Sequence, residues 1–359
     1  MPTLSDFQLG TVPGLLRWYD QTPRRLAFRA STPAEALAWQ AELRETLARL
    51  LGGFPAERCH LDPHLIETVE EERYTRQLVV FQSLPGEYVP CYVLIPRDAA
   101  RHAARDMAAP YRTVIALHGH GSAGARHVVG LPASALEAEH GRAANYDYAR
   151  QLALRGFLVF APTMRGFGER MEPPPLRNVL EEKYASSCEA AGYDALLCGQ
   201  TLLGLRAWDN MRLIDYIEAR DEPRTRGLAC VGLSGGGSAT IYTAALEPRI
   251  TCAVISCAFN PYRDSILPLS HCACNYVPGI VQYAEIADIA GLIAPRPVLI
   301  EAGTQDPSFP VAGTRRAVGD LRRIYERFGA AQSVETDIFE GGHRWSGAKA
   351  YGWLDQELR

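Results

Sequence analysis

The hydrophobic pattern changes character at Tyr111. From there to the end of the chain, short continuous apolar runs alternate with segments that have the 3.6-residue periodicity of helices. Continuous apolar strands separated by helices are typical of a parallel sheet covered on both faces. The pattern therefore predicts an α/β fold with a mostly parallel central sheet. The expected strands are 113–117, 158–161, 228–233, 252–256, 298–302 and, as a more alternating edge strand, 333–339; the expected helices are 147–155, 202–220, 238–246 and 311–328.

The segment before this region has a different pattern. Residues 32–51 carry helical spacing, with Thr32 and Glu35 placed to cap the helix start and Gly52-Gly53 placed to end it. Two β-rich runs, 74–81 and 88–95, flank Pro85-Gly86 and predict an antiparallel hairpin. We therefore expect a helical N-terminal extension over residues 1–70 that packs on a catalytic domain over residues 71–359. Two segments, near 169–199 and 259–295, fit no simple strand–helix unit and are expected to cover the functional site as lid-like insertions.

The strongest local signal is Gly232-Leu233-Ser234-Gly235-Gly236, which lies directly after an apolar strand and directly before a helix. A G-x-S-x-G sequence in this context places the serine on a sharp, strained turn, so its neighbours two positions away must be nearly free of side chains. A glycine-rich phosphate loop is the alternative, but the motif contains no lysine and comes late in the chain. The pattern predicts Ser234 as a nucleophile.

The early strand 113–117 ends in His118-Gly119-His120-Gly121. A loop in this position can supply one backbone N–H to an oxyanion hole, and the residue after the nucleophile can supply the other. The expected donors are His120 and Gly235. For His118 a structural role is favoured over metal binding, because neither a carboxylate nor a cysteine is spaced beside the two histidines.

A nucleophilic serine needs an imidazole to accept its proton and a carboxylate to orient that imidazole. Asp306 follows the strand 298–302, and His343 follows the last strand, so both can reach the same edge of the sheet as Ser234. We predict Asp306 as the acid and His343 as the base. Glu301 and Glu340 are the rival acids: Glu301 is expected within a strand, and Glu340 is too close to His343 in the chain.

Other candidates carry weaker signals. Trp345 and Tyr276 are predicted to line a substrate pocket, although aromatic residues are as often found in cores. His271-Cys272-Ala273-Cys274 resembles half of a zinc site, but no second cysteine pair lies at a suitable spacing, so these thiols are expected to pack the insertion. We therefore predict neither a metal nor a cofactor.

Composition and charge narrow the classes of partner and the cellular compartment that we expect for this chain. The formal net charge is −4, with no long Lys/Arg block, which argues against a nucleic-acid partner. We find no apolar run long enough for a membrane helix and no secretory signal pattern. The nine cysteines are odd in number and scattered, which fits free thiols in a reducing compartment and predicts a cytoplasmic protein. The sequence leaves open whether the chain forms a homo-oligomer.

Taken together, these motifs resemble those of the α/β hydrolases, in the branch that contains acetyl xylan esterases and relatives of dienelactone hydrolase. The likeness covers roughly residues 70–345 and departs from dienelactone hydrolases at Ser234, where those enzymes carry cysteine. It implies a cofactor-free serine esterase for acetyl or other short-chain esters, with a small-molecule or carbohydrate ester as substrate. A prolyl-oligopeptidase-like peptidase and a non-catalytic binding protein on the same fold are the alternatives. The motifs that carry the likeness are His118–Gly121, Arg165–Gly168, Gly232–Gly236, Ala294–Pro297, Gly303–Asp306 and Gly341–His343.

Overall fold

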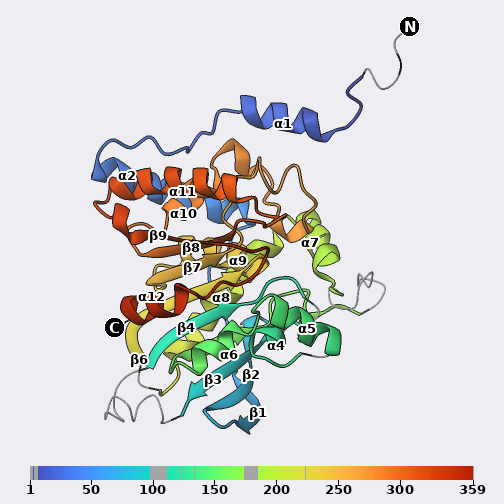
Figure 1. Ribbon diagram of the computed structural model, residues 1–359, viewed down its shortest axis with the longest axis vertical. Coiled ribbons are helices and arrows are strands. Elements are labelled where there is room, and N and C mark those ends of the chain that lie inside the picture. Colours follow the sequence, from blue (N-terminus) through green and yellow to red (C-terminus); the bar gives the residue numbers. More distant parts are fainter. Residues whose placement is uncertain are drawn as a thin grey trace.

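A nine-stranded sheet forms the centre of the computed structural model, which describes residues 3, 7–97, 111–121, 123–132, 134–173, 185–222 and 224–358. The strand order is β1-β2-β3-β5-β4-β6-β7-β8-β9, and Figure 1 shows the sheet with helices on both of its faces. The α/β-hydrolase architecture predicted from the sequence is confirmed. The strands are β1 (His64–Glu70), β2 (Tyr74–Leu84), β3 (Glu87–Pro96), β4 (Tyr111–Leu117), β5 (Leu158–Pro162), β6 (Arg224–Leu233), β7 (Cys252–Ser256), β8 (Val298–Gly303) and β9 (Val334–Phe339).

Strand direction divides the sheet into two parts. β1, β2 and β3 run antiparallel to their neighbours, including the predicted hairpin across Pro85-Gly86, and β3 pairs antiparallel with β5. From β5 to β9 every pairing is parallel. Because parallel strands end at the same edge, the loops after β4, β6, β8 and β9 all leave from one side of the sheet.

Two apolar cores lie on the two faces of the sheet. One contains side chains of α2, α8, α9, α10 and α11, and the other contains side chains of α4, α6 and α12. Burial of both faces explains why the central strands read as continuous apolar runs. The helices that contribute to the two cores are α2 (Pro33–Leu50), α4 (Ala125–Val128), α6 (Tyr148–Ala153), α8 (Leu202–Glu218), α9 (Gly235–Leu246), α10 (Ile286–Gly291), α11 (Val311–Glu326) and α12 (Ala350–Glu357).

The N-terminal segment is bound to the second insertion. α2 begins with the predicted capping box between Thr32 and Glu35. Farther along α2, the Gln40 side chain donates hydrogen bonds to the carbonyls of Gly291 and Ala294, both at 2.9 Å. The shorter α1 (Val12–Gln21) crosses above this layer in Figure 1. The predicted boundary of the helical N-terminal extension at residue 70 is wrong, because β1 pairs with β2 and belongs to the sheet.

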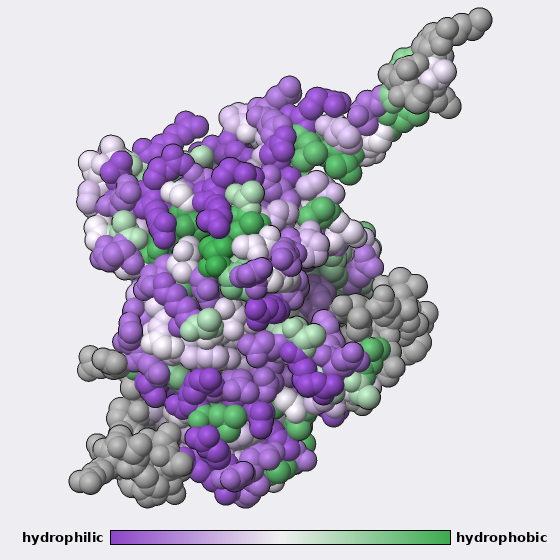
Figure 2. Space-filling view, viewed as in Figure 1, coloured by the Kyte–Doolittle hydropathy of each residue, from purple (hydrophilic) through white to green (hydrophobic). Residues whose placement is uncertain are grey.

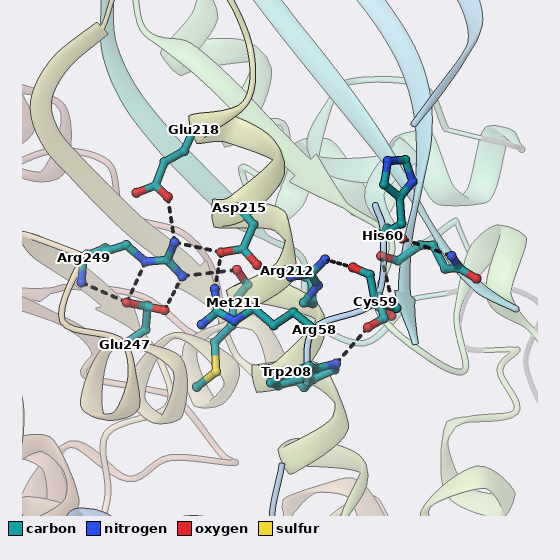
Figure 3. Close-up of polar contacts among 12 residues, drawn as sticks. Arg58, Cys59, His60, Trp208, Met211, Arg212, Asp215, Glu218, Glu247 and Arg249 are labelled. Carbon is teal, nitrogen blue, oxygen red and sulfur yellow. Dashed lines mark hydrogen bonds and ion pairs between the residues drawn. The ribbon is translucent and has the colours of Figure 1, made fainter. Parts of the chain in front are cut away.

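Two acidic residues of α8 lie in different environments. Asp215 pairs with Arg58, Arg212 and Arg249 near the surface (Figure 3). Asp209 is buried and pairs with Arg165 and Arg170. These contacts tie α8 to the segment before β1 and to the loop after β5.

In their described parts, the two insertions contain short helices. In the first, residues 174–184 lie outside the described residues, and the described part carries α7 (Cys188–Leu197). In the second, single turns of 3₁₀ helix occur at η4 (Ala273–Asn275) and η5 (Ile280–Gln282) before α10.

Figure 2 shows a mostly hydrophilic face with apolar side chains gathered beneath α1. Among the helices of the described parts, none is long and apolar enough to cross a membrane.

Candidate active site

Ser234 occupies the turn between β6 and α9 in a strained conformation. Its φ of 58° and ψ of −121° lie in a region that non-glycine residues rarely adopt. A Cβ at Gly232 would lie 2.3 Å from the Gly236 carbonyl oxygen, and a Cβ at Gly236 would lie 2.0 Å from the Leu117 carbonyl oxygen. Only glycine fits at both positions, as the motif predicted.

The loop after β4, residues 118–121, packs directly against this turn. A Cβ at Gly119 would lie 3.2 Å from Ser234 Cβ, and a Cβ at Gly235 would lie 2.8 Å from His120 Nδ1. The two predicted oxyanion donors, His120 and Gly235, are therefore neighbours beside Ser234. This contact also leaves no room for a side chain at position 235.

His118 holds the same loop from within the core. Its Nε2 accepts a hydrogen bond from the Met164 N–H at 2.9 Å, and its Nδ1 donates to the Gly119 carbonyl at 2.7 Å. Complete burial lowers the pKa of His118 to about 3, so the ring is neutral and can play both roles. His118 shapes the loop, in agreement with the structural role expected from the sequence.

The predicted acid, Asp306, and the predicted base, His343, are in direct contact. His343 Nδ1 lies 2.8 Å from Asp306 Oδ2, and Oδ1 of the same carboxylate accepts the backbone N–H groups of Ser308 at 2.8 Å and Phe309 at 3.0 Å. Burial alone would raise the pKa of Asp306, but the His343 contact and these amides outweigh it and lower the pKa. The carboxylate is thus charged and fixed, while the ring of His343, which stacks on Phe309, remains partly exposed.

Backbone contacts connect the nucleophile turn to the loop that carries His343. The Ser234 N–H donates to the Ser256 carbonyl at the end of β7, and the Cys257 N–H donates to the Glu301 carbonyl of β8, both at 2.9 Å. The Cys257 thiol then donates to the Arg344 carbonyl at 3.4 Å. Ser234, Asp306 and His343 therefore lie at one edge of the sheet, after β6, β8 and β9. Cys257, which sequence reasoning did not single out, lies between them.

The rival acids occupy other environments. Glu301 is fully buried within β8 and accepts backbone N–H groups of Ser346 and Gly347 at 3.4 and 3.1 Å. Burial raises the pKa of Glu301 to about 7. Glu340 is exposed at the end of β9. Of the three carboxylates, Asp306 is the one recorded in contact with His343.

Trp345 and Tyr276, both predicted to line the substrate pocket, lie in different environments. Trp345 is fully buried, stacks on Tyr148 with ring centroids 4.5 Å apart, and donates from Nε1 to the Tyr351 hydroxyl. The prediction that Trp345 lines the pocket is wrong, because core packing encloses its whole side chain. Tyr276 is 38% exposed and follows η4, whose Asn275 contacts Ser238 of α9 at 3.4 Å. A role for Tyr276 in substrate binding stays a prediction.

The structure brings together four potential metal ligands whose grouping the sequence did not predict. The side chains of His120, Cys188, Cys272 and Cys274 converge, with one potential ligand atom from each lying within 4.8 Å of the others. The argument against a metal considered only ligands close in sequence, whereas these four come from three separate segments. The fold supplies the cysteines that the sequence neighbours of His120 lack, so the expectation drawn from those neighbours alone is wrong. Neither His118 nor His271 belongs to the group, and His271 instead contacts the Ser265 hydroxyl.

The loop Arg165–Gly168 is anchored rather than free. Arg165 pairs with buried Asp209, and a Cβ at Gly166 would lie 2.6 Å from Cys188 Cα at the start of α7. On its outer side this loop borders a hollow of about 800 Å³ that also involves α7 and contains none of Ser234, Asp306 and His343. The loop therefore supports the first insertion.

Comparisons with known proteins agree with this architecture. The model of the Abhydrolase family matches residues 9–337. A curated protein of Bacillus subtilis (strain 168), named "Putative hydrolase YtaP", is 27% identical over 314 residues, which cover 85% of this chain and 94% of that protein.

Solved structures share the fold at lower identity. An acetyl xylan esterase, described as putative, from Bacteroides fragilis NCTC 9343 superposes with a TM-score of 0.73 at 18% identity, over 94% of this chain and 84% of the other. A glucuronoyl esterase from Solibacter usitatus gives 0.65 at 17%, over 94% and 98%. The family match over most of its length shows that the chain belongs to the Abhydrolase family, and the solved structures share its fold.

Proposed function

We propose that the protein is a serine carboxylic ester hydrolase that cleaves acetyl or other short-chain esters, including esters of carbohydrates, through an acyl-enzyme on Ser234. The observation that carries the proposal is the buried, charged Asp306 held against His343, at the sheet edge where Ser234 stands on its strained turn. The names of the related structures, acetyl xylan esterase and glucuronoyl esterase, support the substrate class.

Each group has a defined part in the proposed reaction. His343 Nδ1–H donates to Asp306, so the unprotonated Nε2 can accept the proton of the Ser234 hydroxyl as its oxygen attacks the ester carbonyl. The protonated imidazole then gives this proton to the leaving alcohol. A water molecule, activated by the same Nε2, attacks the acyl-enzyme, releases the carboxylic acid and restores the serine.

The tetrahedral intermediates require donors for their negative oxygen. The backbone N–H groups of His120 and Gly235 are the proposed donors, because the loop 118–121 and the nucleophile turn are in van der Waals contact at these residues. Removal of one such donor from a hydrolase costs about 3–4 kcal/mol of transition-state stabilisation. Neither amide needs to move far, since His118 fixes the loop from behind.

The direct test is hydrolysis of p-nitrophenyl acetate by Ser234→Ala, with Ser238→Ala, the next serine in the chain, as the matched control on α9. We expect the first variant to lose turnover and the second to keep it. A fluorophosphonate probe should label Ser234 in the wild-type protein, as read by peptide mass spectrometry. Turnover by a folded Ser234→Ala protein would refute the nucleophile, and an unlabelled wild-type serine would favour the non-catalytic alternative.

A peptidase of the prolyl-oligopeptidase type is the second candidate function. The related proteins that were found support an esterase instead: the similar solved structures are named as an acetyl xylan esterase and a glucuronoyl esterase. A side-by-side assay with ester and proline-amide substrates separates the two activities.

A further inference from the structure

The side chains of His120, Cys188, Cys272 and Cys274, here called the Cys3His cluster, come from three segments around the nucleophile turn. His120 lies in the loop after β4, Cys188 begins α7 in the first insertion, and Cys272 and Cys274 flank the start of η4 in the second. Cys188 and Cys274 are buried. The group is thus an internal junction between segments that the sequence separates widely.

The spacing of the four ligand atoms matches a tetrahedral metal site. Zinc binds thiolate sulfur at about 2.3 Å and imidazole nitrogen at about 2.0 Å, so the edges of its tetrahedron are about 3.8 Å between sulfurs and about 3.6 Å between sulfur and nitrogen. The Cys188 and Cys272 sulfurs are 3.3 Å apart. His120 Nε2 lies 3.4 Å from Cys274 Sγ and 3.8 Å from Cys188 Sγ.

A buried arginine supplies the charge that such a site needs. Arg206 of α8 is 1% exposed, and its Nη2 lies 3.1 Å from Cys188 Sγ and 2.7 Å from the Arg165 carbonyl oxygen. The ion pairs recorded for the described residues include none between Arg206 and a carboxylate. Three neutral thiols would leave this guanidinium uncompensated in the core, which is costly. Three thiolates, one Zn²⁺ and a neutral imidazole carry a net charge of −1, which Arg206 balances.

The orientation of the His120 ring also fits. Its Nε2 faces the sulfurs, while its Nδ1 faces the backbone of Gly235 in the nucleophile turn. Phe167 packs edge-on against the ring, with centroids 5.2 Å apart, and restricts its rotation. One imidazole thus separates the Cys3His cluster from the nucleophile turn.

We propose that the Cys3His cluster binds one zinc ion as a closed structural site that joins the loop after β4 to both insertions. Four protein ligands fill the tetrahedron, so the ion has no position left for a water molecule and takes no direct part in bond cleavage. It fixes the loop whose His120 N–H is the proposed oxyanion donor. The metal site itself is independent of the proposed esterase reaction, and only its effect on turnover rests on that reaction.

The metal content of the full-length protein tests the site without reference to activity. The chain is expressed without a polyhistidine tag, purified in reducing buffer with added zinc, desalted, and analysed by inductively coupled plasma mass spectrometry. We expect about one zinc per chain, with three sulfurs and one nitrogen around it by X-ray absorption. Stoichiometric iron or copper in place of zinc would overturn the choice of metal.

Variants locate the site. Cys188→Ser and Cys274→Ser should lose the zinc, whereas Cys198→Ser should keep it, because Cys198 is exposed and lies outside the cluster. If the ligand variants fail to fold, the wild-type protein still decides through zinc release measured during thiol modification of the native chain. A metal-free wild type with titratable thiols would overturn the proposal. So would a Cys188–Cys272 disulfide found by mass spectrometry of the non-reduced protein.

Discussion

Replacement of Asp306 by asparagine tests the proposed roles of His343 and its acid most directly. In the wild-type protein, Oδ1 of Asp306 accepts two backbone N–H groups, from Ser308 and Phe309, and Oδ2 faces His343 Nδ1. An asparagine will keep its carbonyl oxygen toward the two amides, because the opposite orientation sets an NH2 group against two N–H donors. Its NH2 group must then face His343 Nδ1, which becomes an acceptor. The proton of His343 moves to Nε2, so this tautomer cannot take the proton of Ser234.

The magnitude follows from the two backbone hydrogen bonds. Turning the amide to restore the working tautomer leaves both N–H groups unpaired, at about 1–3 kcal/mol each, or about 2–6 kcal/mol together. Since about 1.4 kcal/mol corresponds to a factor of ten, this penalty alone lowers the active population by roughly 30-fold to 10⁴-fold. The loss of the carboxylate charge beside the imidazolium lowers kcat further. We therefore expect kcat to fall by about 10³-fold or more.

The assay is steady-state hydrolysis of p-nitrophenyl acetate, with a thermal unfolding curve for each variant. Asp320→Asn, an exposed change on α11, is the matched control and should keep wild-type turnover. Glu301→Gln tests the rival acid and should cost much less than Asp306→Asn. The reasoning fails if folded Asp306→Asn retains more than about a tenth of wild-type kcat, or if Glu301→Gln loses as much.

Three further outcomes are expected. Trp345→Ala should lower the free energy of unfolding by about 3–5 kcal/mol in a denaturant titration, because it opens a cavity between Tyr148 and Tyr351; a change under 1 kcal/mol would contradict its place in the core. Gly235→Ala should reduce kcat, since its Cβ would meet His120 Nδ1 at 2.8 Å, and a fully active variant would exclude the packing of these two loops. The pKa of Glu301 is about 7 in the folded protein and near 4.5 in the unfolded chain, so the folded state binds the Glu301 proton more tightly. The contribution of Glu301 to the free energy of unfolding is therefore complete below pH 4.5 and is lost as the pH rises through 7. The loss is about 3 kcal/mol at most, and Glu301→Gln should flatten that part of the curve of unfolding free energy against pH.

The parts of the site that could be predicted from sequence are those fixed by local sterics and strand order. The glycines around Ser234 are required by a turn whose contacts lie within a few residues and one neighbouring strand, so the motif alone contains the information. Asp306 and His343 were found because each follows an apolar strand, and parallel strands bring such loops to one edge. The central strands were predicted for the same reason, since burial of both faces leaves a continuous apolar run.

What could not be predicted depends on contacts between distant segments. Cys188 has no partner near it in the chain, and only the packing of α7 against the loop Arg165–Gly168 brings it to His120. Trp345 was misassigned because proximity to His343 in sequence does not say which way a side chain points. β1 was missed because it forms an exposed antiparallel edge, where the alternating pattern is weak and most side chains face solvent.

The attachment of α2 to the second insertion predicts how N-terminally truncated variants of the chain will behave. Gln40 and Arg44 donate to main-chain carbonyls of Gly291, Leu292 and Ala294. Through these bonds α2 holds the segment that leads into β8 and on to Asp306. A shortened protein that starts after residue 60 would uncover apolar side chains of α9 and α10 and release that stretch. Such a fragment should precipitate or lose its ordered acid loop, even though every residue named in the chemistry would still be present.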